Sequence, residues 1–350
     1  MRPVQDVPEP LVVTLGELML RLRPPGFERL LQSPVLEATF GGGEANVAAS
    51  LARFGLHARF VTALPAGPLG DAAVAEMRKH GVDVSRVIRR PGRLGIYFLE
   101  PGAAQRASSV VYDRDGAAMA LATPDEFDWH RIFDGATWFH VSGITPALSS
   151  NAGEVTAAAL AAAKARGITT SLDLNFRAKM WRYGKAAPEV MRAIMGDVDV
   201  AIANEEDCQR SLGIEAASNV AGGQIDVAVY ADLTERVLDA FPRLSAIAVT
   251  LRQSRGADIN GWSACHRDGD GFRVGAQHEI LDIVDRVGSG DAFAAGLIYG
   301  RIRKMPVAKA LDFAIAAGCL KHSIPGDVNL VGVAEVERLA AGDTSGRVRR

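Results

Sequence analysis

Short apolar segments alternate along the chain with segments of helical periodicity. Apolar and β-branched residues dominate the segments at 11–19, 58–64, 137–143, 168–175, 198–204 and 245–251, and each of these predicts a strand. Amphipathic helices are predicted at 44–55, 70–81, 152–166, 188–196, 205–212 and 232–241. Such alternation is typical of a parallel sheet that is covered by helices on both faces. The pattern therefore predicts an α/β fold with a central, mostly parallel sheet.

Two stretches break this alternation, at 20–40 and 88–122, where strands follow one another without intervening helices. We expect them to form one small β-sheet lid beside the ligand crevice of the main sheet. The chain is then a single domain over 1–350, whose core comprises 11–19, 41–87 and 123–340. Strands of such a lid would leave edges and aromatic faces exposed, so a homodimer or dimer-based oligomer with the lids at the interface is expected.

Composition narrows the class of partner. The 350 residues carry a net charge of −2, which gives no sign of a nucleic-acid surface, and no segment has the length and apolarity of a membrane span. Three scattered cysteines without metal-ligand spacing indicate a reducing compartment, and the N-terminal "MRPVQDVPEP" lacks the apolar core of a signal peptide. We expect a cytoplasmic protein that acts on a small molecule and binds neither membrane nor nucleic acid.

The clearest candidate for chemistry is "DRVGSGDAFAAG", residues 285–296. Gly288, Ser289 and Gly290 precede Asp291 at the expected start of a helix. The unpaired N–H groups and positive dipole end there can cradle a phosphate, and the carboxylate can accept a proton from a substrate hydroxyl. Phosphoryl transfer needs little more than such positioning and charge neutralisation. The alternative is an aspartate that merely caps a helix after a glycine turn.

A second glycine cluster, "GGGEANVAASLARFG" at 41–55, precedes another predicted helix, with Asn46 in its first turn. Glycines here permit close approach of a ligand or serve as a hinge. The later positions of a dinucleotide-binding G-x-G-x-x-G are not matched, and the chain contains no Walker-type phosphate loop.

Together, the two segments resemble the paired signatures of the PfkB (ribokinase-like) family of carbohydrate kinases, and the resemblance extends over about residues 11–340. One departure is Arg286, where the family usually has a small or β-branched residue. The resemblance implies a ribokinase-like fold and an ATP-dependent reaction with Mg²⁺. It also implies that Asp291 is the catalytic base and that Gly288, Ser289 and Gly290 form the anion hole.

Several further segments, among them "LGELMLRLRPPGFERLLQ", "VVYDRDGAA" and "LDLNFRAKMW", resemble the branch of this family that phosphorylates 2-dehydro-3-deoxy-D-gluconate at its terminal hydroxyl. That substrate is a sugar acid, and arginine is suited to holding a carboxylate with two hydrogen bonds. The resemblance implies a substrate site made of Gly42, Asn46, Tyr97, Tyr112, Arg114, Arg177 and Asp327. Four of these residues have an alternative role: Arg177 could cap a helix or form an ion pair, Tyr97 and Tyr112 could be sheet aromatics, and Asp327 could belong to a turn.

The nucleotide side departs further from the family pattern. "VDVAIANEEDC" resembles the family's N-x-x-E segment but places Asp207 where glutamate is usual, so Asp207 is either a Mg²⁺ ligand or an acidic residue at a helix start. "AVTLRQSRGADINGW" replaces a shorter nucleotide loop. The candidates for ATP contacts are Asn175, Asn204, Thr250 and Arg252. Asp285 is predicted to join a monovalent-cation site for K⁺, as in some relatives.

Two other functions remain open from the sequence alone. One is a kinase for a neutral sugar such as fructose or ribose, and the other is a non-catalytic sugar-acid sensor on the same fold. The intact segment from Gly288 to Asp291 speaks against the sensor, and Arg114 and Arg177 speak against a neutral sugar.

Overall fold

The computed structural model describes residues 9–204, 206–215 and 226–345. Its main sheet has nine strands: β1 (Leu11–Leu15), β4 (His57–Val61), β9 (Ala136–Ser142), β10 (Thr169–Asp173), β11 (Val200–Asn204), β12 (Ala246–Ser254), β13 (Asn260–Asp268), β14 (Gly271–Val274) and β15 (His278–Ile280). The order is β14-β13-β12-β11-β10-β9-β1-β4, and β15 also pairs with β13. The pairs from β4 to β12 are parallel, and the remaining pairs are antiparallel.

Helices cover both faces of this sheet because its strands are apolar on both sides. Val12 belongs to one core and its neighbour Val13 to the other. The first core holds residues of α1 (Gly43–Arg53), α2 (Pro68–Lys79), α10 (Ser289–Ile302), α11 (Val307–Lys321) and α12 (Val333–Ala340). The second holds residues of α3 (Ala118–Leu121), α4 (Trp129–Ile132), α6 (Ser150–Lys164), α7 (Ala187–Met195), α8 (Asp207–Leu212) and α9 (Val227–Ala240). The short α5 (Ile144–Ala147) precedes α6, and Pro124–Glu126 form a 3₁₀ turn.

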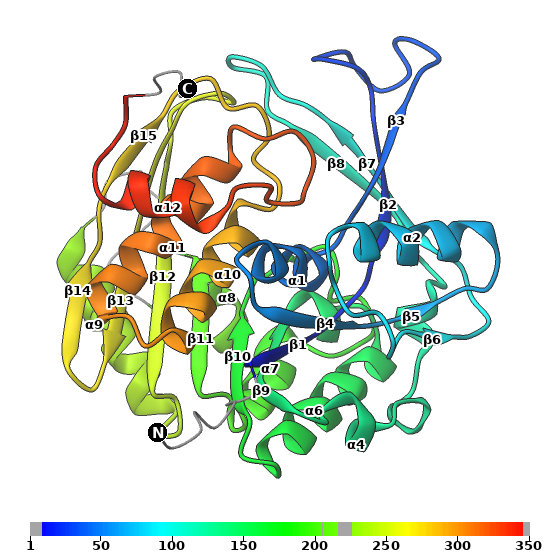
Figure 1. Ribbon diagram of the computed structural model, residues 1–350, viewed down its shortest axis with the longest axis horizontal. Coiled ribbons are helices and arrows are strands. Elements are labelled where there is room, and N and C mark those ends of the chain that lie inside the picture. The colour runs from blue at the N-terminus through cyan, green and yellow to red at the C-terminus, as the bar shows by residue number, and fades with distance from the viewer. Residues whose placement is uncertain (1–8, 205, 216–225, 346–350) are drawn as a thin grey trace, which may run out of the picture.

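A separate four-stranded sheet rises from one end of the core (Figure 1). It consists of β2 (Met19–Arg23), β3 (Glu37–Gly41), β7 (Gly95–Glu100) and β8 (Ser109–Asp113), in the order β3-β2-β7-β8. The short strands β5 (Ala63–Leu64) and β6 (Ile88–Arg89) form a third pair. The predicted ribokinase-like α/β architecture, with a mostly parallel sheet and a small additional sheet, is thus confirmed. Among the described residues, no helix combines the length and apolarity that a membrane crossing requires.

Two local predictions need correction. The apolar run at 11–19 is not one strand: β1 ends at Leu15, and β2 begins at Met19 in the other sheet. Gly16 lies at the break, where a Cβ atom would overlap the Glu44 carboxylate.

The segment at 248–262 is not an extended loop either. It is an antiparallel hairpin in which β12 continues to Ser254 and β13 begins at Asn260, because this edge of the sheet is extended by paired strands.

Candidate active site

A cavity of about 470 Å³ opens between the four-stranded sheet, the carboxyl ends of β10, β11 and β12, and the start of α10. Ligands of open α/β sheets bind at this edge. Most residues expected to form the site line this cavity: Gly42, Tyr97, Tyr112, Asn175, Arg177, Asn204, Asp207, Thr250, Arg252, Gly288, Ser289, Gly290, Asp291 and Asp327. Asn46, Arg114 and Asp285 do not line it directly.

Asp291 lies in the first turn of α10, half-buried at the cavity wall. Burial raises the pKa of its carboxyl to about 7, and a hydrogen bond from Asn46 partly opposes that rise. The Asn46 Nδ2 donates to Asp291 Oδ2 at 2.7 Å, which joins the start of α1 to the start of α10. A carboxyl group with a pKa near 7 can take up and release a proton at neutral pH, as a general base must.

The backbone before Asp291 is shaped by its glycines. Gly288 caps α10 with φ 84°, in the left-handed region, and a Cβ atom there would overlap the Asp327 carbonyl oxygen. A Cβ on Gly290, by contrast, would meet no atom within 4 Å and would extend into open space. The space beside Gly290, in the first turn of α10, is therefore open to an anion.

The four-stranded sheet contributes aromatic side chains to the cavity, and a cationic group stands behind them. Tyr97 and Tyr112 pair across β7 and β8, with ring centroids 6.0 Å apart. Arg114 follows β8, and its guanidinium stands 5.2 Å from the centre of the Tyr112 ring. That guanidinium forms an ion pair with the buried Glu17. Burial raises the pKa of the Glu17 carboxyl, and the charge of Arg114 opposes only part of that rise. The arginine that was expected to hold the substrate carboxylate is thus paired with Glu17.

Arg177 is exposed, lines the cavity and follows the carboxyl end of β10. Its Nη1 donates to the Phe176 carbonyl at 2.9 Å. The turn that presents it begins with Asp173, whose Oδ1 accepts from the Asn175 N–H at 3.1 Å, and Asn175 itself adopts φ 35°. Asparagine tolerates this left-handed conformation better than most residues. The chain therefore turns into the cavity directly after the strand and places a positive charge at its mouth.

The far end of the cavity is built by β11 and β12. Asp207 accepts from the backbone N–H groups of Phe176 and Asn204, each at 2.9 Å, and so fixes the two loops to each other. Thr250 donates to the Ala203 carbonyl at 3.3 Å, and the Arg252 guanidinium stands 5.4 Å from the centre of the Trp262 ring. The expected nucleotide contacts Asn175, Asn204, Asp207, Thr250 and Arg252 thus line the same cavity as Asp291 and Arg177.

Comparison with known proteins decides the family. A model described as "pfkB family carbohydrate kinase" matches residues 9–330. The chain belongs to the PfkB family of carbohydrate kinases. It is therefore a sugar kinase, which transfers a phosphoryl group to an alcohol.

Individual PfkB relatives extend over nearly the whole chain. A 2-dehydro-3-deoxygalactonokinase of Haloferax volcanii is 35% identical, covering 96% of this chain and 98% of that protein. A 2-dehydro-3-deoxygluconokinase of Bacillus subtilis is 26% identical, with 94% of each chain covered. The crystal structure of a 2-dehydro-3-deoxygluconokinase of Thermotoga maritima is 46% identical, superimposes with a TM-score of 0.91, and covers 95% of this chain and 100% of that one.

The residues at the nucleotide end are compatible with Mg²⁺ that arrives with ATP, as PfkB kinases use it. No group of three or more side chains suited to holding a metal exists within 9–204, 206–215 and 226–345. Mg²⁺ commonly needs only one or two carboxylates besides substrate phosphates. Asp207 and Asp173 are buried carboxylates whose pKa values are raised by burial, and the exposed Glu206 lies at the rim. Both carboxylate oxygens of Asp207 already accept hydrogen bonds from backbone N–H groups. Asp173 and Glu206 are therefore candidate Mg²⁺ ligands as well as Asp207.

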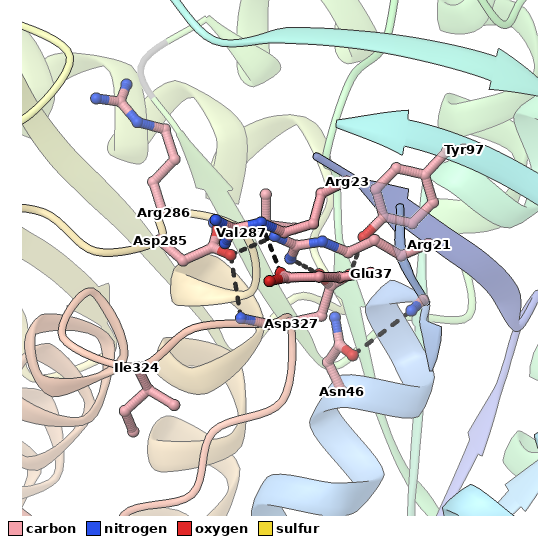
Figure 2. Close-up of polar contacts among 12 residues, drawn as sticks. Arg21, Arg23, Glu37, Asn46, Tyr97, Asp285, Arg286, Val287, Ile324 and Asp327 are labelled. Atoms are coloured by element: carbon pink, nitrogen blue, oxygen red, sulfur yellow. Dashed lines mark hydrogen bonds and ion pairs between the residues drawn. The ribbon is translucent and has the colours of Figure 1, made fainter. Parts of the chain in front are cut away.

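Sequence reasoning missed Arg21, which is fully buried in β2. Its guanidinium forms ion pairs with both Asp285 and Asp327, and Tyr97 donates to Asp327 Oδ2 at 2.5 Å (Figure 2). The one available signal is the alternation in "MLRLR", which places Arg21 on the same inward side as Met19. These contacts fasten the four-stranded sheet to the loops around α10.

Two further buried carboxylates went unnoticed. Glu44, in the first turn of α1, accepts from Ser142 N–H, Ser142 Oγ and Thr145 Oγ1 at 2.7–2.9 Å, so it locks α1 to the end of β9. Asp173 is the other. Glu44 lies in the first turn of a helix and Asp173 at the end of a strand, and the local sequence gives no sign of what either carboxylate contacts.

Proposed function

We propose that the protein phosphorylates 2-dehydro-3-deoxy-D-gluconate, or its galactonate epimer, at the terminal hydroxyl, with ATP as donor and Mg²⁺ as the metal. The observation that carries the proposal is the composition of one cavity. It joins a carboxyl of pKa about 7 at a helix N-terminus to an exposed arginine at its mouth. The sugar-acid kinases named above, which match the chain almost end to end, support the same substrate class.

In this proposal Asp291 takes the proton of the terminal hydroxyl as that oxygen bonds to the γ-phosphorus. The bond between the γ-phosphorus and the β–γ bridging oxygen breaks, and ADP leaves with the negative charge. Gly288, Ser289 and Gly290 lend the N–H groups and the positive helix end that stabilise charge on the transferring phosphoryl group. Mg²⁺ neutralises phosphate charge when it is bound with ATP. Asn46 holds Asp291 in place through its 2.7 Å hydrogen bond. The proton remains on Asp291 until it is released to solvent after product departure.

At the other end of the substrate, Arg177 receives the carboxylate, together with Arg114 if the latter exchanges Glu17 for the substrate. Tyr97, Tyr112, Gly42 and Asp327 form the wall between the carboxylate and the reacting hydroxyl. These two arginines suit an acid sugar, because a neutral ketose has no charge with which to pair them. The four-stranded sheet acts as the lid that covers this half of the site.

An ADP-release assay over a panel of sugars tests the proposal. Saturating MgATP is combined with 2-dehydro-3-deoxygluconate, 2-dehydro-3-deoxygalactonate, fructose and ribose, each over a range of concentrations. We expect kcat/KM for at least one of the two acids to exceed that for either neutral sugar by about 100-fold or more, since a site built for a charged group discriminates strongly against its absence. Equal or higher values for fructose or ribose would make the neutral-sugar kinase the better assignment. Lack of turnover with any sugar would favour the sensor.

A further inference from the structure

The carboxylate expected to bind a monovalent cation is already fully engaged by the protein. Asp285 Oδ1 accepts from the Val287 N–H and Oδ2 from the Gly326 N–H, both at 3.1 Å. Oδ2 is also the partner of the Arg21 guanidinium (Figure 2). Asp285 and Arg21 are both buried, at 6% and 0% exposure. The residues present therefore do not fit K⁺ at this carboxylate, because a protein cation and two N–H groups surround it.

A second protein cation occupies the carbonyl groups next to this carboxylate. Lys321, the last residue of α11, is fully buried. Its Nζ donates to the Ile324 carbonyl at 3.0 Å and lies 3.4 Å from the Asp285 carbonyl. Backbone carbonyl oxygens are the ligands that an alkali-metal ion would use, and here they receive an ammonium group. One carbonyl belongs to the turn after α11 and the other to the loop that leads into Gly288.

The buried charges around Asp285 balance, since Asp291 and Arg286, which also act on this cluster, add one charge of each sign. Arg21 and Lys321 supply two positive charges, and Asp285 and Asp327 supply two negative charges. Tyr97 adds a neutral hydroxyl that donates to Asp327. A further cation in the same place would leave one buried positive charge without a partner, which is strongly unfavourable in a protein interior.

We propose that Arg21 and Lys321 are built-in cations that replace a bound monovalent ion, so that this kinase needs no K⁺. The two side chains act as positioning residues. They hold Asp285 and the Asp285 carbonyl, and through them the loop that runs from Asp285 to the anion-hole residues Gly288–Gly290. Arg21 comes from β2, so the same contact also ties the lid sheet to that loop.

The first test uses the wild-type protein in KCl, NaCl or tetramethylammonium chloride at equal ionic strength, with excess Mg²⁺ in every sample. We expect the same kcat and the same thermal midpoint in all three salts. A rate that K⁺ raises by more than about two-fold over tetramethylammonium, far below the roughly 10²–10³-fold that one charge-stabilising group contributes, would overturn the proposal. So would a midpoint raised by K⁺ alone. The comparison of kcat rests on the proposed function, because it needs a substrate that the protein phosphorylates. The comparison of thermal midpoints needs no substrate, so it tests the inference even if no sugar acid is turned over.

The second test removes the ammonium group. Lys321→Ala opens a space beside the Asp285 and Ile324 carbonyls, and we expect kcat in tetramethylammonium to fall about ten-fold or more while KM for ATP changes little. KCl or NH₄Cl should restore part of the lost rate by filling that space. Lys309→Ala, on the exposed side of the same helix, should match the wild type in every salt. Full activity of Lys321→Ala in tetramethylammonium, or a loss that neither cation restores in a folded variant, would contradict the proposal. If the variant does not fold, the wild-type salt comparison decides alone.

Discussion

Asn46 donates a 2.7 Å hydrogen bond to Asp291, although 245 residues separate them in the chain. The bond connects the two glycine-preceded helices of the site, α1 and α10, at their N-terminal turns. It favours the charged form of a carboxyl group that burial otherwise keeps protonated. The base and the group that tunes it therefore come from opposite ends of the sequence.

Replacing Asp291 by asparagine should remove the base and leave the shape of the site intact. We expect kcat to fall by about 10²–10⁴-fold, with a small change in KM for either substrate. Steady-state kinetics with the sugar acid and MgATP provide the measurement. A variant that keeps most of its kcat would exclude Asp291 from proton transfer.

The raised pKa of Asp291 also has a consequence for stability. Folding favours its protonated form, so its contribution to stability is complete below the unfolded pKa and is lost as pH rises through about 7. Asp291→Asn, which cannot ionise, should therefore have a higher thermal midpoint than the wild type at pH 8. Near pH 4 the two midpoints should converge. Differential scanning calorimetry across this range measures the difference, and a constant gap would mean that burial does not perturb the carboxyl.

The pH profile of kcat/KM should report the same group. Because the base must be unprotonated, activity should decline below an apparent pKa near 7. Asn46→Ala removes the hydrogen bond that lowers this pKa, so the acid limb should move to higher pH. Ser50, which bonds to the Asn46 carbonyl from the next turn of α1, provides a control: Ser50→Ala should leave the limb in place. An unshifted limb in Asn46→Ala would separate Asn46 from the base.

Two glycines of α10 should respond oppositely to alanine. Gly290→Ala adds a methyl group that meets no protein atom within 4 Å, and alanine in place of glycine stabilises a helix by up to about 1 kcal/mol. Its thermal midpoint should thus hold or rise while kcat/KM falls, because the methyl group enters the expected phosphate space. Gly296→Ala, whose Cβ would meet the Ala314 backbone at 2.7 Å, should instead lower the midpoint. An active Gly290→Ala variant would place the phosphate elsewhere.

The exposed edge of the four-stranded lid sheet predicts that the protein forms an oligomer. β8 is an edge strand, and Val111, whose neighbour Tyr112 points into the cavity, is 50% exposed on the opposite face. Such an unpaired edge with an exposed apolar side chain usually meets a partner, so we expect a homodimer through the lid sheets. Multi-angle light scattering should give twice the mass of 37.1 kDa, and Val111→Glu should shift it toward the monomer. A monomeric wild type would contradict this expectation.

The sequence predicted what is encoded locally. The segment from Gly288 to Asp291 is short and contiguous, and Arg177 directly follows a strand, so local pattern alone places both at the ligand edge of the sheet. Arg21 could not be placed in this way, because its partners Asp285 and Asp327 lie 264 and 306 residues away. Periodicity identifies an inward position but not the charge that lies opposite it.

Gly42 shows a second limit of sequence reasoning. Its small size suggested room for a ligand, and it does line the cavity. In the structure, however, a Cβ atom at this position would overlap the Glu17 carbonyl. The glycine is thus required by the approach of two backbone segments, which no local pattern reveals. Bulk at Gly42 would disturb the fold as well as substrate binding.

The central claim, that Arg177 selects an acid substrate, is tested most directly by a ratio. It is kcat/KM for 2-dehydro-3-deoxygluconate divided by kcat/KM for fructose, measured for the wild type, Arg177→Ala, Arg177→Lys and the control Arg182→Ala, an exposed arginine outside the cavity. We expect Arg177→Ala to reduce this ratio by about 2 kcal/mol, roughly thirty-fold, through loss of the acid activity alone. Arg177→Lys should restore part of it, because an ammonium group cannot make the two-pronged contact, and Arg182→Ala should leave it unchanged. An unchanged ratio in Arg177→Ala would contradict the carboxylate assignment and favour a neutral-sugar kinase.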